Sequence, residues 1–193
     1  MPDIIKPKPL SLYKALDIGY LRDEAKQKKK LKKFGYRLVP ELTTREHVVA
    51  FNPASDKLLY ISNGTDFSNR RDVQNDVLGA IGKQQSSARM AEERSALLKA
   101  KQEFNPKATT LVSHSLGSQY TNYIAGGGDS VIQYNPYYTA GAKSRPNVHN
   151  YRAPTDVVSA FAPKANTTIL KAKSVNPVSA HNIDNLKEAA IFV

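Results

Sequence analysis

Residues 108–118 of the sequence read Ala-Thr-Thr-Leu-Val-Ser-His-Ser-Leu-Gly-Ser. The first six are mostly apolar or β-branched, which is typical of a buried strand in a parallel sheet, and a helix is expected right after Ser115. A serine between a strand and a helix, flanked two positions away by the small residues Ser113 and Gly117, fits the sharp turn called a nucleophile elbow. Bulky residues at those two positions would collide with the adjacent strand and helix. Ser113 stands where glycine is usual, so the alternative that Ser115 only caps the helix stays open.

Outward from this turn, strand patterns alternate with helix patterns. Strands are predicted at residues 47–51, 57–62, 108–113, 130–134, 148–152 and 167–171. Helices are predicted at 72–81 and 84–104, between Ser115 and Gly126, and over a short stretch at 156–161. Turn residues at 52–56 join the first two strands into a hairpin. This order predicts an α/β fold, with a mostly parallel sheet covered by helices on both faces.

The elbow hypothesis requires a base and an acid, because a serine hydroxyl is a weak nucleophile. In sites of this type the acid and then a histidine follow the serine along the chain, and Asp156 and His181 stand in that order. Asp156 follows a predicted strand, so it lies at the edge where the sites of open α/β sheets gather. His181 is the one histidine of four in a late polar loop. Asp129, at a strand entrance, and Asp184, close to His181, are the alternative acids.

Acyl transfer also requires hydrogen-bond donors for the developing oxyanion. The backbone N–H of Leu116, directly after the serine, supplies one. The predicted strand at 57–62 runs into Asn63-Gly64-Thr65, and a glycine there lets the backbone turn an amide toward the site. The alternative interpretation of this stretch is an ordinary Asn-Gly hairpin turn.

The net charge of +11 is concentrated near the N-terminus, where residues 1–37 hold 11 Lys and Arg against 4 Asp and Glu. Like charges at this density must be solvated or matched by an anionic partner. The candidate anion-binding residues are Lys26, Lys28, Lys29, Lys30, Lys32 and Lys33. A solvated face or mobile arm, an anionic membrane surface and, less favoured, nucleic acid are the three interpretations. We therefore expect a basic N-terminal tail or helix at 1–35 and a compact domain at 36–193.

Composition excludes several classes of protein. The sequence has no cysteine, which excludes disulfide frameworks, cysteine nucleophiles and thiolate metal sites, and no metal or cofactor is expected. The longest apolar runs, such as 189–193, fall far short of the ~20 residues that a membrane-spanning helix needs. The N-terminal residues lack the apolar stretch of a signal peptide, so we expect a soluble protein.

With these pieces in place, the chain resembles the class 3 lipase family of α/β-hydrolases over about residues 36–193. The matching features, in chain order, are Gly64-Thr65 after a strand, the acidic Asp72 and Asp76, the elbow His114-Ser115-Leu116-Gly117, Tyr134-Asn135-Pro136, Asp156 and His181. The chain departs from the family at Ser113, where glycine is usual, and at Asn63, where arginine commonly precedes Gly-Thr.

The resemblance implies a serine hydrolase, of lipase or phospholipase type, that cleaves carboxylic esters of lipids. In that case Ser115 is the nucleophile, His181 the base and then the acid, and Asp156 the group that orients the histidine. Thr65 and Leu116 form the oxyanion hole, and the basic arm docks on anionic membrane. The lysine-rich N-terminus also suggests an intracellular or virion-associated viral protein. The alternative is a catalytically silent protein on a hydrolase scaffold that binds membrane or nucleic acid through its basic N-terminus.

Overall fold

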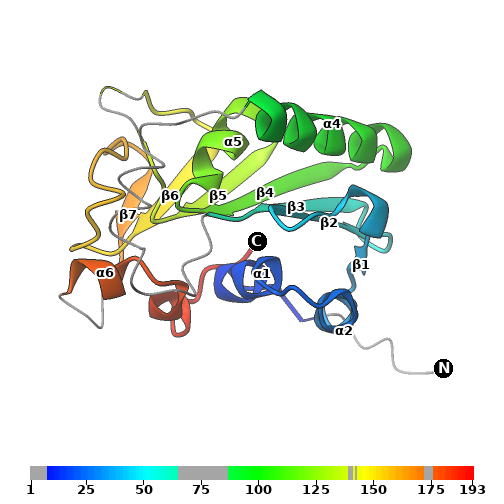
Figure 1. The fold of residues 1–193 in the computed structure, drawn as a ribbon, viewed down its shortest axis with the longest axis horizontal. Coiled ribbons are helices and arrows are strands. Elements are labelled where there is room, and N and C mark those ends of the chain that lie inside the picture. The colour runs from blue at the N-terminus through cyan, green and yellow to red at the C-terminus, as the bar shows by residue number, and fades with distance from the viewer. Residues whose placement is uncertain (1–7, 65–86, 139–140, 142, 172–175) are drawn as a thin grey trace.

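The computed structural model describes residues 8–64, 87–138, 141, 143–171 and 176–193. Its centre is a seven-stranded sheet in which the strands lie side by side in chain order (Figure 1). The strands are β1 (Arg37–Leu38), β2 (His47–Asn52), β3 (Lys57–Ser62), β4 (Ala108–His114), β5 (Ser130–Tyr134), β6 (Val148–Arg152) and β7 (Thr167–Ile169). The first three strands pair antiparallel, and β3 to β7 pair parallel. The prediction of a mostly parallel α/β sheet is confirmed.

The predicted hairpin is present and sets the antiparallel edge of the sheet. β2 pairs with β3 from His47 opposite Ser62 to Asn52 opposite Lys57. The Asn52 side chain accepts hydrogen bonds from the backbone N–H groups of Ala54 and Ser55, which is the local turn that asparagine favours.

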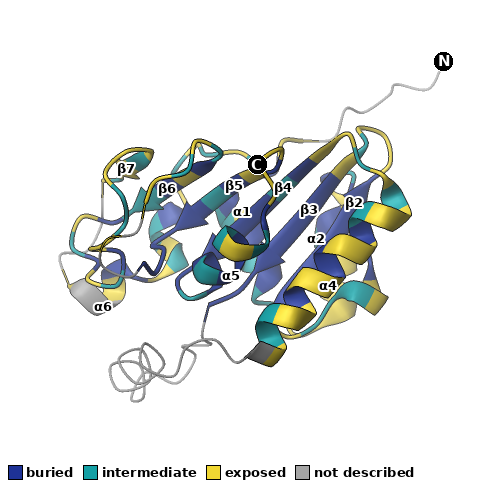
Figure 2. Cartoon of the chain, turned by 90° about the horizontal axis from the view of Figure 1, so that it is seen from above, coloured by how far each residue is buried: buried dark blue, intermediate teal, exposed yellow. Residues whose placement is uncertain are grey.

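Both faces of the sheet are covered, because the buried strand residues alternate between two clusters. Val49 and Leu58 face the cluster under α4 (Ser87–Phe104), whereas Val48 and Leu59 face the cluster on the opposite side. α4 and α5 (Gly117–Ile124) lie on one face, and α1 (Leu12–Gly19) and α2 (Glu24–Lys32) lie on the other (Figure 1). Figure 2 shows the strands as a buried layer, with α4 exposed on its outer side.

The N-terminal segment is part of this packed domain, which corrects the boundary predicted after residue 35. Its buried apolar side chains are Leu10, Leu12, Ala15, Leu16, Ile18, Leu31 and Phe34, and they share one core with strand residues. The C-terminus joins the same layer, since the Leu12 N–H donates to the Ile191 carbonyl (2.8 Å) and the Val193 N–H donates to the Leu10 carbonyl (3.0 Å). The physical reason is the strand order. Parallel strands in chain order carry their right-handed crossover helices on one face, so the other face needs cover from elsewhere in the chain.

The lysine run forms the exposed side of α2 and its end. Only Gln27 and Leu31 of this helix are buried. Lys26 forms an ion pair with Asp23, the N-cap of this helix, and Lys28 forms one with Glu24 in its first turn. Lys30 pairs with Asp17 of α1. The lysines therefore form a solvated helix face, and α2 contacts the core through Gln27 and Leu31 on its opposite side.

Several smaller predictions change. No helix forms at 156–161, where the chain makes successive turns because the Asp156 carboxylate accepts the backbone N–H groups of Val158 and Ser159. The structure also contains the short elements η1 (Pro40–Leu42), α6 (Pro177–Ala180) and η2 (Ile183–Leu186). The helix predicted at 72–81 lies outside the described residues. Among the helices that the structure does describe, none has the length and apolar character to cross a membrane.

Candidate active site

Ser115 occupies a strained turn between β4 and α5. Its φ angle is +53°, in the left-handed region that most residues avoid, and its side chain is 2% exposed. A Cβ atom added to Gly117 would lie 2.3 Å from the Ser62 carbonyl oxygen, so only glycine fits there. Ser113, at the position where glycine is usual, is buried, and its Oγ lies 2.9 Å from Oγ1 of Thr121. That hydrogen bond accommodates the serine hydroxyl within the elbow.

The structure brings Ser115, His181 and Asp156 together in one hydrogen-bonded row. The Ser115 Oγ lies 2.8 Å from the His181 Nε2, and the His181 Nδ1 lies 2.9 Å from the Asp156 Oδ1. An ionised carboxylate only accepts, so Nδ1 carries the proton, and in a neutral ring Nε2 accepts from the serine hydroxyl. This is the arrangement in which a histidine can take the serine proton.

The Asp156 carboxylate is buried, and burial works to raise its pKa. Hydrogen bonds from His181 and from the side chain and backbone of Ser159 outweigh that effect, so the pKa of Asp156 lies below its ordinary value. Asp156 is therefore ionised at neutral pH, as an acid that orients a histidine must be. Ser159 was not among the residues singled out from the sequence, although it stands three positions after the acid.

The two alternative acids have partners elsewhere. Asp129 forms an ion pair with Lys101, with Nζ to oxygen distances of 2.6 and 2.7 Å. Asp184 pairs with Lys187 at 3.0 Å on the surface. The histidine ring thus faces Asp156 rather than either of these carboxylates.

Gly64 lies directly against the elbow, on the side where the sequence predicts the oxyanion donors. A Cβ atom added there would lie 2.7 Å from the Ser115 Cβ and 2.9 Å from the His114 carbonyl oxygen. The next described strand, β4, runs parallel to β3, so these two strands do not form a hairpin with each other. Leu116 is the N-cap of α5 and follows the serine directly. Thr65, the other predicted oxyanion residue, lies outside the described residues, as do Asp72 and Asp76.

No protein-family model matches the sequence, and no curated protein matches it either. Solved structures, in contrast, do align with the chain. The Rhizomucor miehei lipase propeptide complex aligns with a TM-score of 0.50 and 12% identity over 80% of this chain and 62% of that chain. A deletion mutant of that complex aligns with a TM-score of 0.54 and 11% identity, over 80% of this chain and 61% of that chain. The Lip2 lipase from Yarrowia lipolytica aligns with a TM-score of 0.51 and 12% identity, over 79% of this chain and 73% of that chain. The chain has a lipase-like fold. It spans just over three fifths of the Rhizomucor chains that it matches.

A buried ion pair supports the loop after β3 in this lipase-like fold. The Arg89 Nε donates to the Glu93 carboxylate at 2.8 Å, and an Nη2 of the same arginine donates to the Asn63 carbonyl at 2.7 Å. Burial raises the pKa of Glu93 to about 7, whereas Arg89 and the hydroxyl of Ser62 act to lower it. This pair was not predicted from the sequence, although a spacing of four residues on a predicted helix is its signal.

The predicted anion-binding lysines lie away from the hydrogen-bonded row. α2 packs beside β1 at the edge of the sheet, whereas Ser115 follows the central strand β4. Within the described part of the chain, no cluster of His, Asp or Glu side chains could hold a metal ion.

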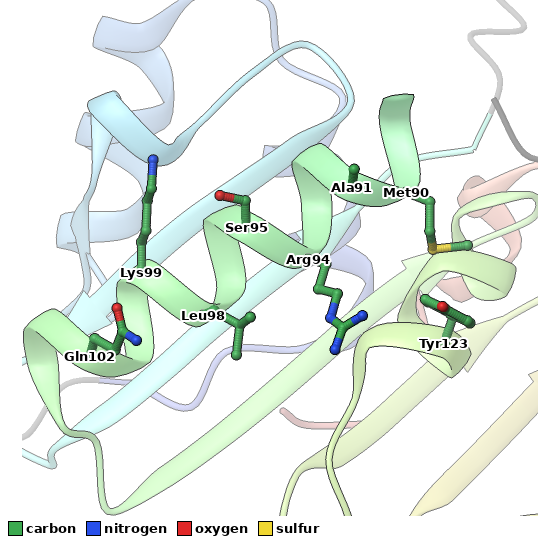
Figure 3. Close-up of a pocket in the computed structure, with 8 residues that line it drawn as sticks. All are labelled: Met90, Ala91, Arg94, Ser95, Leu98, Lys99, Gln102 and Tyr123. Atoms are coloured by element: carbon green, nitrogen blue, oxygen red, sulfur yellow. The ribbon is translucent and has the colours of Figure 1, made fainter. Parts of the chain in front are cut away.

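A separate hollow lies on the outer side of α4, beside α5 (Figure 3). The residues that line it are Met90, Ala91, Arg94, Ser95, Leu98, Lys99, Gln102 and Tyr123. None of them belongs to the row of Ser115, His181 and Asp156, so this hollow is distinct from the candidate active site.

Proposed function

We propose that the protein is a serine hydrolase that cleaves carboxylic esters of lipids. The observation that carries this proposal is the hydrogen-bonded row from Asp156 through His181 to Ser115 at a strained elbow. The lipase-like fold supports lipid esters as the substrate class. The alternative, a catalytically silent protein on the same scaffold, predicts that this row does no chemistry.

The proposed reaction proceeds in two halves. The His181 Nε2 takes the Ser115 proton while Oγ attacks the ester carbonyl carbon, and the negative charge moves to the carbonyl oxygen. The Leu116 N–H and a donor from the loop that begins at Gly64, which we assign to Thr65, stabilise that oxygen. The imidazolium then protonates the departing alcohol, and an acyl-enzyme remains on Ser115. Water, activated by the same histidine, releases the fatty acid and restores the serine.

Labelling with a fluorophosphonate probe tests this function. The probe forms a bond to an activated serine through phosphorus, so we expect one label per chain on Ser115, together with hydrolysis of short-chain nitrophenyl esters and of lipid emulsions. Denatured protein serves as the control, because the row is lost on unfolding. Absence of both labelling and ester release from folded protein would favour the catalytically silent alternative.

Replacing Asp156 with asparagine is expected to lower kcat for a soluble ester by a factor of about 10² to 10⁴. The amide keeps the shape of the carboxylate but no longer holds the proton on the His181 Nδ1 or stabilises the imidazolium. Steady-state kinetics of Asp156→Asn measures the loss. Asp184→Asn is the matched control, since Asp184 is an exposed acid near the same histidine, and equal losses in both variants would refute the role of Asp156.

We further propose that the exposed face of α2 docks the enzyme on anionic membrane. Each basic residue near such a surface contributes about 1 kcal/mol, so a triple Lys29→Gln, Lys32→Gln, Lys33→Gln variant should bind phosphatidylserine vesicles about 100-fold more weakly. Hydrolysis of a soluble ester should not change, because α2 lies away from Ser115.

Sedimentation with vesicles measures the binding. The control removes three exposed lysines from other surfaces, in the variant Lys57→Gln, Lys99→Gln, Lys171→Gln. Equal loss in both variants indicates attraction by net charge alone, and salt-sensitive binding to nucleic acid without vesicle binding supports the nucleic-acid alternative.

A further inference from the structure

Three hydrogen bonds connect the two sides of the candidate active site behind Ser115. The Gly64 N–H donates to the Tyr20 hydroxyl oxygen at 3.1 Å. That hydroxyl lies 2.7 Å from the His114 Nδ1, and the His114 Nε2 lies 2.9 Å from the backbone carbonyl oxygen of His181. The connection thus runs from the oxyanion side of the elbow to the backbone of the proposed base.

The partners determine which nitrogen of His114 carries the proton. A carbonyl oxygen only accepts, so Nε2 must donate to His181, and Nδ1 must then accept from the Tyr20 hydroxyl. Burial lowers the pKa of His114 to about 3, so the ring is neutral at neutral pH. The imidazole is 3% exposed and lies 4.8 Å, centroid to centroid, from the ring of His181.

We propose that Tyr20 and His114 are positioning residues that hold Gly64 and His181 in place around the serine. The His181 carbonyl requires the proton of His114 on Nε2, so Nδ1 needs a donor, and the Tyr20 hydroxyl supplies it. Without that hydroxyl, the His114 Nδ1 loses its donor and the Gly64 N–H loses its acceptor, which is costly at a buried site. The His114 ring then shifts to find another donor, and its hydrogen bond to the His181 backbone moves the base away from Ser115. Tyr20 comes from the end of α1, so the N-terminal segment takes part in the site as well as in the core.

This inference rests on the proposed function, and Tyr20→Phe tests it. The variant keeps the ring and removes only the hydroxyl. We expect kcat for a soluble ester to fall about 10- to 100-fold with KM changed less than about twofold, since a displaced base slows chemistry rather than binding. Tyr13→Phe is the matched control, because it removes a hydroxyl from the same helix at a half-buried site whose ring lies under Lys187. Equal losses in both variants would show that helix packing alone is responsible, and would overturn the proposal.

Nitrogen NMR of the histidine rings gives a readout that does not depend on activity. In the wild-type protein, His114 should show the neutral form with its proton on Nε2 and no titration between about pH 5 and 8. Tyr20→Phe should change the His114 Nδ1 signal and shift the His181 signals as well. If wild-type protein releases no ester but these shifts occur, the proposed function fails and the positioning role stands. If the His181 signals stay unchanged in Tyr20→Phe, the positioning role is wrong, whatever the activity.

Discussion

Ser115→Ala is expected to lower the rate of ester release by a factor of about 10⁴ or more. The substitution removes the Oγ of the proposed nucleophile, while His181 and Asp156 keep their hydrogen bond. In serine hydrolases, removing the serine alone costs about as much as removing every member of the triad, because the three groups act as a unit. The activity that remains comes from substrate binding and oxyanion stabilisation.

The fold should tolerate this substitution. Alanine at a φ of +53° is strained to about the same degree as serine, and the lost hydrogen bond to His181 lies within the site itself. Measuring kcat/KM and the unfolding temperature together separates chemistry from folding. Ser95→Ala, on the exposed side of α4, is the control and should retain full activity. Substantial ester release by a folded Ser115→Ala protein would overturn the proposed mechanism.

The parts of the site that could be predicted are those with a local signature or a required order. The elbow is local, because small residues must flank the serine wherever a strand turns sharply into a helix. Asp156 and His181 are distant in sequence, but the chemistry demands an acid and a histidine after the serine, and few residues of the right type follow strands there. In the structure, the three side chains lie within hydrogen-bond distance of one another.

The supporting contacts could not be predicted in the same way. Tyr20 reaches His114 across 94 positions of sequence, and no spacing rule relates a tyrosine at the end of one helix to a histidine at the end of a distant strand. The buried pair of Arg89 and Glu93 looks, from the sequence, like an ordinary surface pair on a helix. Which face of that helix is buried depends on tertiary packing.

The N-terminal segment was misjudged for a related reason. The charged residues stand close together in the sequence of α2. The apolar residues are spread over and around two helices, and they form a core only when both helices pack on the sheet. Charge therefore dominated the prediction of a separate tail. The segment packs against the sheet face that the crossover helices leave open, so it belongs to the folded domain.

A chain reduced to residues 36–193 is accordingly expected not to fold. Deletion removes six large, buried side chains of the core, namely Leu10, Leu12, Leu16, Ile18, Leu31 and Phe34. Burying each contributes about 1.5–3 kcal/mol, so the loss of roughly 10 kcal/mol or more is comparable with the whole net stability of a domain, about 5–15 kcal/mol. The deletion also exposes Val48, Leu59 and Val112 to water and removes Tyr20 from the site.

Circular dichroism and thermal unfolding of the 36–193 chain test this expectation, with ester release measured on the same samples. The control is the chain of residues 1–193 with glutamine at each of the six positions Lys26, Lys28, Lys29, Lys30, Lys32 and Lys33, which removes the charge and keeps the packing. We expect this variant to unfold cooperatively and to hydrolyse soluble esters, whereas the shortened chain should do neither. Cooperative unfolding and full activity of the shortened chain would instead mean that the segment is a dispensable tail. The pair of proteins thus separates what the N-terminus contributes through its apolar face from what its lysines contribute.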